Sequence, residues 1–303
     1  MEDFEKNLIE ELQERPEAFD ENKFSELCDR LRNAEETLSF SAFKEFIPPY
    51  GSPRKFMAYK LRQKKTTPAM LLGDMIDCAL LTPEEFENRY LIIPSNCALN
   101  SGEGVNNWGR FLNSQGIKID LFGLPFKEAK AVVQFGIEQL HATKRVVQHG
   151  QKELAESIAS AVLKNPTAQH YIQQIGVTQA PIEYGAFGWT WRGKKDAEAD
   201  NFIMDMKLTV AANEKDFSYQ IRKMGYLYQA AIYTKGGEVK KDFLFMGYDR
   251  SGEVVIMEIP VAYLVQAWEQ MEYYIGQFNK MIFLDRFLWS QDFWTRNGVY
   301  QYR

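Results

Sequence analysis

A short apolar segment in the second half of the chain carries two opposite charges. Residues 203–208 read Ile-Met-Asp-Met-Lys-Leu, which is the composition of a buried strand. Because side chains alternate between the two faces of a strand, Asp205 and Lys207 share one face, and the two methionines and the leucine point to the other. The segment therefore predicts a strand whose apolar face enters a core and whose second face holds a charged pair.

A third charged residue, Asp196, lies nine residues before Asp205. We expect the preceding strand to end near Trp191, so that a hairpin brings Asp196 beside Asp205. Two carboxylates and a backbone carbonyl are hard oxygen ligands that suit Mg²⁺ or Mn²⁺. Such a metal polarises a scissile phosphate and activates water, and Lys207 can orient or deprotonate that water. For the tripeptide 205–207 alone, a structural salt bridge is the favoured interpretation.

Neighbouring segments supply further polar side chains. Glu183, on the preceding predicted strand, either completes an acidic cluster or faces solvent. Gln229 and Tyr233 are four residues apart in a helical segment and share a face, and Tyr226 lies one turn earlier. This polar stripe suits contacts with a DNA backbone. An amphipathic helix with half-buried tyrosines is the alternative, and it is favoured for this segment alone.

The order of the predicted elements favours a mixed α/β core behind a helical N-terminal half. Residues 1–37 read as an acidic helical extension, and residues 38–303 as the main domain. Residues 95–125, rich in Asn, Gly and Ser, read as a loop. We expect further helices at 68–81, 126–146, 150–164, 217–235 and from 261 onward, and strands at 182–191, 202–209, 243–248 and 254–259.

Composition limits the class of protein. No apolar run has the length of a membrane span, and the N-terminus lacks the features of a signal peptide. The three cysteines show no CxxC spacing, which favours free thiols and a cytoplasmic location. The net charge of −5 is unusual for a nucleic-acid protein, but local basic clusters can still contact phosphates. These clusters are Arg54-Lys55; Lys60, Arg62, Lys64 and Lys65; and Arg192, Lys194 and Lys195.

Taken together, these segments resemble the PD-(D/E)XK nuclease superfamily, and within it the RecE and λ-exonuclease branch, which includes phage exonucleases. The resemblance runs from about Leu38 to Met257. Two upstream segments, 38–44 and 72–86, also resemble the branch, through a serine-containing helix and a Pro-Glu-Glu-Phe turn. The residues that match the catalytic motifs are Glu183, Asp196, Asp205-x-Lys207 and Gln229-x-x-x-Tyr233.

The chain departs from the family pattern at two positions. Asp77 occupies a position where many relatives have a metal-binding histidine, and aspartate can also bind Mg²⁺ or Mn²⁺. The Arg-Pro-Asp of many relatives is here Lys194-Lys195-Asp196. The three histidines of the chain fall in other segments, and we interpret them as structural: His141, His149 and His170.

The resemblance implies a restriction-endonuclease-like core sheet flanked by helices, and a Mg²⁺- or Mn²⁺-dependent deoxyribonuclease. It implies a 5′-to-3′ exonuclease on linear double-stranded DNA that leaves 3′ overhangs for recombination. Relatives form ring-shaped homo-oligomers, so a trimer or tetramer with a basic lumen is expected, and a single-strand annealing protein is an expected partner. No membrane partner is expected.

The resemblance also assigns roles to single residues. Asp196, Asp205 and the carbonyl of Met206 would hold the metal. Asp77 and Glu183 would help to hold the metal or its water molecules. Lys207 would position the attacking water. The expected DNA contacts are Gln229, Tyr233 and Tyr226, with Ser39, Ser41 and Arg54 as grips on a terminal phosphate.

Two rival functions remain from the sequence. An endonuclease of the same fold would cut internally and would not need a DNA end. A DNA-binding or assembly protein could instead keep the fold without catalysis, and the aspartate at position 77 supports this alternative. The presence of Asp196, Asp205 and Lys207 argues against it. A third alternative is a soluble protein in which Asp205 and Lys207 form only a salt bridge.

Overall fold

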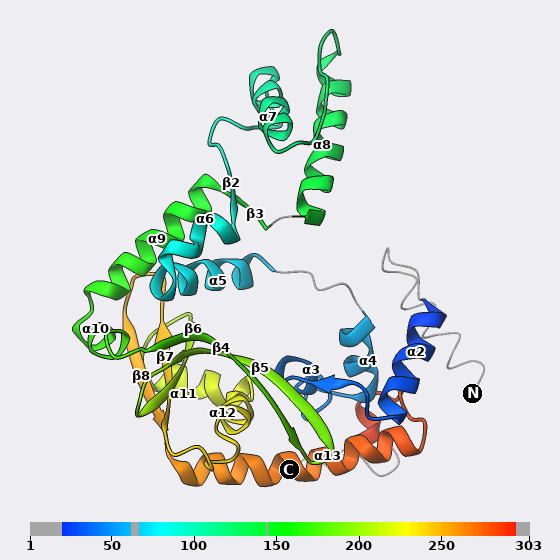
Figure 1. Ribbon diagram of the computed structural model, residues 1–303, viewed down its shortest axis with the longest axis vertical. Helices are drawn as coiled ribbons and strands as arrows, with labels where there is room; N and C mark the ends of the chain where they lie inside the picture. The colour runs from blue at the N-terminus through cyan, green and yellow to red at the C-terminus, as the bar shows by residue number, and fades with distance from the viewer. Residues whose placement is uncertain (1–19, 62–66, 144, 295–303) are drawn as a thin grey trace.

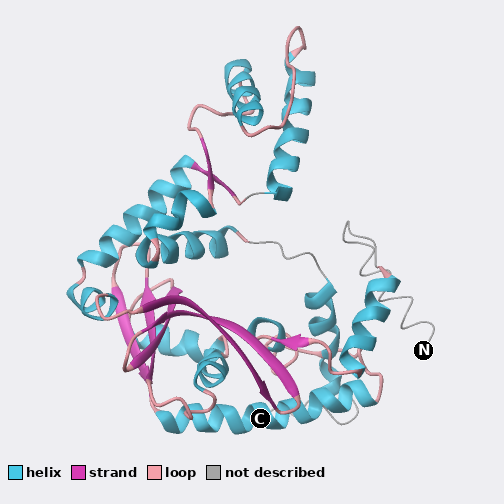
Figure 2. Cartoon of the chain, in the orientation of Figure 1, coloured by secondary structure: helices cyan, strands magenta, loops and turns pink. Residues whose placement is uncertain are grey.

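A computed structural model describes residues 20–61, 67–143 and 145–294. At its centre lies a six-stranded mixed sheet (Figure 1). Five strands follow the order β1-β5-β6-β7-β8, where β1 and β6 pair with different parts of the same edge of β5, and β4 pairs along the opposite edge of β5. The pairs β1–β5 and β6–β7 are parallel, and the pairs β4–β5, β5–β6 and β7–β8 are antiparallel. The predicted mixed α/β fold is therefore confirmed, with helices around a central sheet (Figure 2).

The elements follow one another along the chain in the predicted general order. The sheet strands are β1 (Thr37–Leu38), β4 (Val177–Ala186), β5 (Trp189–Glu198), β6 (Phe202–Leu208), β7 (Asp242–Tyr248) and β8 (Val254–Ile259). The first helices are α2 (Glu21–Arg32), α3 (Phe40–Phe43), α4 (Pro53–Leu61), α5 (Pro68–Leu81), η1 (Pro83–Glu85) and α6 (Phe86–Arg89). The others are α7 (Gly102–Ser114), α8 (Phe126–Thr143), α9 (His149–Lys164), α10 (Pro166–Ile172), α11 (Glu214–Lys223), α12 (Tyr226–Thr234), α13 (Val261–Phe283) and η2 (Gln291–Trp294).

Both faces of the sheet are covered, each by its own hydrophobic cluster. Ile203, Phe243 and Phe245 pack with residues of α2, α3, α4, α12 and α13. The alternate residues Met204 and Met206 pack with residues of α5, α9 and α10 on the other face. The alternation predicted for β6 is therefore present, but the face of Asp205 is also buried, because α12 and α13 cover it.

The predicted strand 182–191 is in fact two strands. Phe187 and Gly188 have φ angles of 53° and 80°, and this left-handed turn joins β4 to β5 as a hairpin. Asp196 consequently lies inside β5, and not in a turn before β6 as expected. Similarly, Gly225, with φ 68°, divides the predicted helix 217–235 into α11 and α12.

β5 changes the face that its side chains present. Trp189 and Trp191 belong to the cluster beneath α12 and α13, whereas Ala197 belongs to the cluster beneath α5 and α9. Strict alternation would place all three on one face. The irregularity coincides with Gln179 of β4, which has a φ of 55° and forms no ladder pair with Asp196. The faces of Asp196 and its neighbours therefore could not be read from strand periodicity.

A helical hairpin extends away from the sheet (Figure 1). It is formed by α7 and α8, has a small hydrophobic cluster of its own, and is joined to the rest by the parallel strands β2 (Leu91–Ile93) and β3 (Val146–Gln148). The expectation of a loop over 95–125 is wrong for its central part. Ser101 caps α7, and Val105, Trp108 and Leu112 form its buried face, a helical spacing masked by the surrounding Gly and Asn residues.

The N-terminal part is helical where the structure describes it. Leu27, Cys28 and Leu31 of α2 pack into the main core. The first of the two helices predicted there, before Pro16, lies outside the described residues, and the domain boundary at residue 37 stays a prediction. At the C-terminal side, α13 is the long amphipathic helix expected from Val261 onward. Among the helices within the described ranges, none combines the length and apolar character that crossing a membrane requires.

Candidate active site

The charged pair of β6 lies on the face covered by α12. Asp205 is 1% exposed, and its Oδ2 forms a direct ion pair with the Lys207 ammonium. Burial raises the pKa of Asp205 to about 7, although the lysine opposes this shift. Burial alone would lower the pKa of Lys207, but the carboxylates of Asp205 and Asp196 outweigh it and raise that pKa. Lys207 is therefore a fixed cation in this arrangement.

Asp196 lies beside Asp205, as expected, although it reaches that place from within β5. The β5–β6 ladder ends at the pair Ala197–Met204, so Asp196 and Asp205 are the next residues of the two strands, one position beyond the last pair. Asp196 Oδ2 accepts a hydrogen bond from the backbone N–H of Met206 at 2.9 Å. Burial raises the pKa of Asp196, while Lys207 and this hydrogen bond lower it. Two carboxylates are thus held next to one ammonium.

The edge of β5 is open at this point. β4 covers one edge of β5, while β1 and β6 share the other, pairing with residues 190–191 and 197–198 respectively. Between them, the Lys194 carbonyl accepts a hydrogen bond from the Tyr233 hydroxyl at 2.8 Å. The site therefore lies along the part of the β5 edge that neither β1 nor β6 covers.

Gln229 and Tyr233 of α12 form a hydrogen-bond network with the carboxylate of Asp205. Gln229 Nε2 donates hydrogen bonds to Asp205 Oδ1 at 2.8 Å and to the Tyr233 hydroxyl oxygen at 3.2 Å. The two residues are only 8% and 9% exposed. They share one helix face, as predicted, but they bind the carboxylate and the β5 backbone in place of the expected open DNA surface. These hydrogen bonds connect α12 to the Asp205 carboxylate and to the backbone of β5.

Asp77 approaches from α5, on the opposite side of the sheet. Its Oδ1 accepts a hydrogen bond from the Tyr248 hydroxyl at 2.7 Å. Burial raises the pKa of Asp77, and so does the negative charge of Asp196, whereas Tyr248 and Lys207 lower it. Because these charges act on one another, Asp77 belongs to the same electrostatic group as Asp196, Asp205 and Lys207.

The charge balance of this group suits a cation. Three buried or recessed carboxylates stand against one ammonium, and Oδ2 of Asp205 has no hydrogen-bond partner in the described part of the chain apart from its ion pair with Lys207. Carboxylate oxygens are the ligands that Mg²⁺ and Mn²⁺ prefer, so the donor chemistry fits such an ion. The described residues contain no three His, Cys, Asp or Glu side chains already gathered around one point. The fit is therefore one of chemistry and charge, without a preformed coordination shell.

The side chains of this group differ in their exposure to solvent. Asp77, Asp196 and Lys207 each keep intermediate surface exposure. Only Asp205 is sealed from solvent. Water can therefore reach part of the Asp77, Asp196 and Lys207 side chains.

Tyr226 links the site to the serine-containing helix. The Lys207 ammonium lies 5.1 Å from the centre of the Tyr226 ring, a cation–π distance. Tyr226 in turn contacts Phe40 of α3, with ring centres 6.5 Å apart. Ser39 caps α3 through the backbone N–H of Ala42, and Ser41 is exposed on the same helix. The two serines thus flank Phe40, which contacts Tyr226, which in turn contacts Lys207. In the described part of the chain, no hydrogen bond joins either serine to the acidic group.

The structure does not bring Glu183 or Arg54 to the acidic group. Glu183 forms a bidentate ion pair with Arg192, and both side chains are more than half exposed. It therefore lies outside the acidic cluster, in the solvent-facing position that was its alternative. The backbone N–H of Arg54 donates to the Trp289 carbonyl at 2.9 Å, and its Nε is directed at the Leu288 carbonyl at 3.4 Å. Arg54 thus fastens α4 to the segment after α13.

Sequence reasoning missed Tyr248. Tyr248 is the last residue of the strand predicted at 243–248, and the sequence gives it no role beyond that strand. Its hydroxyl is the only signal that separates it from the phenylalanines earlier in β7, Phe243 and Phe245. The three histidines make no contact with the acidic group: His149 lies near Glu153, His170 packs on Tyr171, and His141 is on α8.

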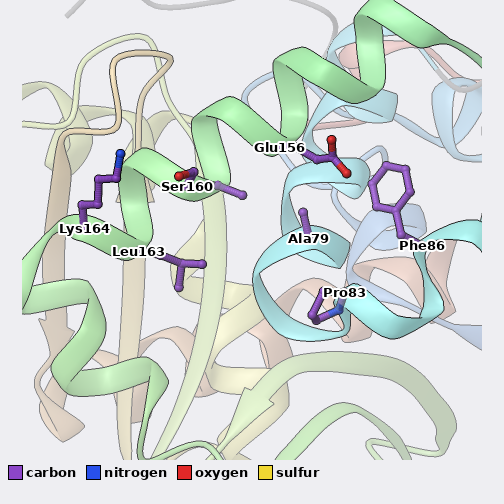
Figure 3. A pocket seen from close by; sticks show the side chains of 8 residues that line it. Ala79, Pro83, Phe86, Glu156, Ser160, Leu163 and Lys164 are labelled. Atoms are coloured by element: carbon purple, nitrogen blue, oxygen red, sulfur yellow. The ribbon is translucent and has the colours of Figure 1, made fainter.

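A pocket of about 330 Å³ lies elsewhere, between α9 and the α5–η1 turn (Figure 3). Ala79, Pro83 and Phe86 form one side, and residues of α9, among them Glu156 and Lys164, form the other. Ala79 is two residues from Asp77 on α5, and such residues point about 200° apart on a helix. This pocket is therefore separate from the acidic group.

The fold and the acidic group together define a protein of the PD-(D/E)XK nuclease class. The model of the family described as "PDDEXK-like domain of unknown function (DUF3799)" matches residues 39–247, more than half of the chain, so the chain belongs to this family. A search of curated proteins finds no match.

Among solved structures, the chain is similar to a candidate exonuclease from Eubacterium rectale. The TM-score is 0.53, the sequence identity is 15%, and the match covers 84% of each chain. At this identity the likeness concerns the fold. The resemblance to the superfamily drawn from the sequence motifs is thus confirmed, and the placement in the RecE and λ-exonuclease branch stays a prediction.

Proposed function

We propose that this protein is a metal-dependent deoxyribonuclease. The observation that carries the proposal is the adjacency of Asp196 and Asp205 on neighbouring strands, with Lys207 paired to Asp205. Two carboxylates that can bind a hard metal ion, Asp196 and Asp205, thus lie next to each other and next to the ammonium group of Lys207. Membership of a PDDEXK-like family supports hydrolysis of phosphodiester bonds as the chemistry.

The metal would be Mg²⁺ or Mn²⁺. Asp196, Asp205 and the Met206 carbonyl would hold it, with Asp77 as a further ligand from α5. When bound, such an ion polarises the scissile phosphate and lowers the pKa of a coordinated water. Glu183 has no part in this proposal, because its carboxylate is engaged with Arg192 at the surface.

Each remaining side chain of the group has a separate role. Lys207, whose raised pKa keeps it protonated, orients the attacking water and offsets the negative charge that develops on the phosphate. It does not act as the base, which is a change from the sequence-based alternatives. Gln229 holds Asp205 through Oδ1, and Tyr233 fixes the β5 backbone at Lys194. These contacts keep the carboxylates in place during turnover.

Within this class we propose an exonuclease that degrades the 5′-ended strand of linear duplex DNA and leaves 3′ overhangs for recombination. The motif resemblance to the RecE and λ-exonuclease branch supports this, and so does the likeness to a structure described as a candidate exonuclease. A ring-shaped homo-oligomer with a basic lumen would reconcile DNA binding with the net charge of −5. A single-strand annealing protein is the proposed partner.

A gel assay with end-labelled DNA tests the proposal. The substrates are linear duplex, 5′-phosphorylated or not, and covalently closed circular duplex, each with Mg²⁺ or with EDTA. The expected result is Mg²⁺-dependent release of nucleotides from linear DNA and an intact circle. Cutting of the circle would identify an endonuclease instead. No cleavage of either substrate with Mg²⁺ or Mn²⁺ would overturn the proposed activity, and a monomer in light scattering would remove the ring.

A further inference from the structure

Tyr248 places a hydroxyl group in the middle of an apolar layer. It is the last residue of β7, is fully buried, and packs with residues of α5 and α9. The parallel register pairs it with Leu208, directly after Lys207. A buried hydroxyl is unfavourable unless it finds a hydrogen-bond partner. The partner here is Asp77 Oδ1, at 2.7 Å and 171 residues away in sequence.

The packing alone does not require this hydroxyl. Phenylalanine would fill the same space, since it differs from tyrosine only by the oxygen. The hydroxyl and the carboxylate of Asp77 therefore form a matched pair, in which each group satisfies the other. The pair joins α5 to the central sheet at the side of the acidic group.

Asp77 uses only one of its two oxygens in this pair. Within the ranges that the structure describes, Tyr248 is the single hydrogen-bond donor to Asp77, and it binds Oδ1. Oδ2 is left as an acceptor, and the side chain retains some exposure to solvent. The neighbouring charges that repel Asp77 are Asp196 and Asp205, and the one that attracts it is Lys207. A third carboxylate next to two others is costly unless a cation joins them.

From this geometry we infer that Tyr248 is a positioning residue that fixes Asp77 through Oδ1 and leaves Oδ2 to bind the divalent metal. The inference rests on the proposed metal-dependent function. It assigns to the tyrosine the task that second-layer hydrogen bonds perform at metal sites, where they orient a ligand and limit its freedom. Asp77 then acts through one oxygen, as a histidine would through one nitrogen.

The affinity of the full chain for Mn²⁺ and for Mg²⁺, measured by calorimetry in the absence of DNA, tests this inference. Tyr248→Phe removes the hydroxyl and keeps the ring, and we expect its affinity for either metal to fall about 10-fold or more. The matched control is Tyr184→Phe, because the Tyr184 hydroxyl is also engaged, donating to the Ile232 carbonyl at 2.7 Å, but lies away from Asp77. This control should bind metal as the wild type does.

A second arm keeps the test valid if Tyr248→Phe folds poorly. Asp77→Asn can still accept the tyrosine hydrogen bond but lacks the charged oxygen, so it should also lose affinity. In the Asp77→Asn background, Tyr248→Phe should add little further loss, because both changes affect one ligand. A Tyr248→Phe protein of lower thermal stability but unchanged metal affinity would show a purely structural role and overturn the inference, as would wild-type affinity in Asp77→Asn.

The outcomes separate this inference from the proposed function. A wild-type chain that binds neither Mg²⁺ nor Mn²⁺ would contradict the metal-dependent function itself, and the inference with it. A wild-type chain that binds metal and cleaves DNA, beside variants at Tyr248 and Asp77 that bind metal equally well, would contradict the inference alone.

Discussion

The side-chain amide of Gln229 donates a hydrogen bond to Oδ1 of Asp205 at 2.8 Å, and both residues are buried. Oδ2 of the same carboxylate pairs with Lys207. The two oxygens of Asp205 are therefore held by two different elements, α12 and β6. This arrangement fixes the plane of the carboxylate, and it gives the motif Gln229-x-x-x-Tyr233 a structural task beneath the site.

Replacing Gln229 by alanine should disturb both Asp205 and Tyr233, because one amide group binds both. We expect a loss of about 1–3 kcal/mol in the free energy of unfolding, since a buried acceptor loses its donor. The nuclease kcat should fall at least about 10-fold with little change in KM. Urea unfolding and steady-state kinetics measure these effects. Gln270→Ala, at an exposed glutamine that accepts from Tyr228, is the control, and an equal loss in both variants would contradict the assignment.

Lys207→Ala should abolish Mg²⁺-dependent nucleolysis, with a loss of at least about 100-fold in kcat, because the only ammonium of the acidic group is removed. The variant should also be less stable at pH 8, since the buried Asp205 loses its ion-pair partner. Lys215→Ala, at an exposed lysine on α11, should change neither property. Retained activity in Lys207→Ala would end the assignment of this lysine to the site.

Metal and pH should act together on stability. The pKa of Asp205 rises from 3.8 to about 7 in the folded protein, and the pKa values of Asp77 and Asp196 rise as well. A raised carboxylate pKa means that the folded state binds protons more tightly than the unfolded state. The stability that these groups contribute is therefore complete below about pH 4 and is lost as the pH rises through about 7.

Mg²⁺ should restore the stability lost at higher pH, because it replaces the protons among the ionised carboxylates. The rise in Tm on replacing EDTA by Mg²⁺ should be larger at pH 8 than at pH 5.5. Differential scanning fluorimetry measures it. An equal rise at both pH values, or a larger one at pH 5.5, would contradict the metal-site assignment of these carboxylates.

Glu183→Ala should leave nuclease activity unchanged, because the carboxylate pairs with Arg192 at the surface. Its effect on stability should stay within about 0.5 kcal/mol, as is usual for an exposed ion pair. Asp196→Ala, one strand away, should abolish activity in the same assay. A Glu183 variant that loses activity as completely as Asp196→Ala would show that the residue reaches the metal during turnover.

Local sequence patterns were sufficient for several parts of the site. The alternation of residues 203–208 correctly placed Asp205 and Lys207 on one face, and the four-residue spacing correctly placed Gln229 and Tyr233 on one face of a helix. Both patterns depend only on the geometry of a single element, in which each side chain direction follows from the residue number. The mixed α/β fold followed from the order of such elements.

Tertiary structure decided the rest. The β5–β6 register brings Asp196 beside Asp205, and the change of face in β5 near Gln179 occurs where the strand passes from one hydrophobic cluster to the other. The hydrogen bond from Tyr248 to Asp77 joins residues 171 positions apart, and Glu183 faces away because its strand pairs it with Arg192. The sequence by itself determined which residues are available for the site, because local periodicity encodes the direction of each side chain. Only the packing of distant elements decided which of them meet, because contacts across such separations depend on register and burial and not on local spacing.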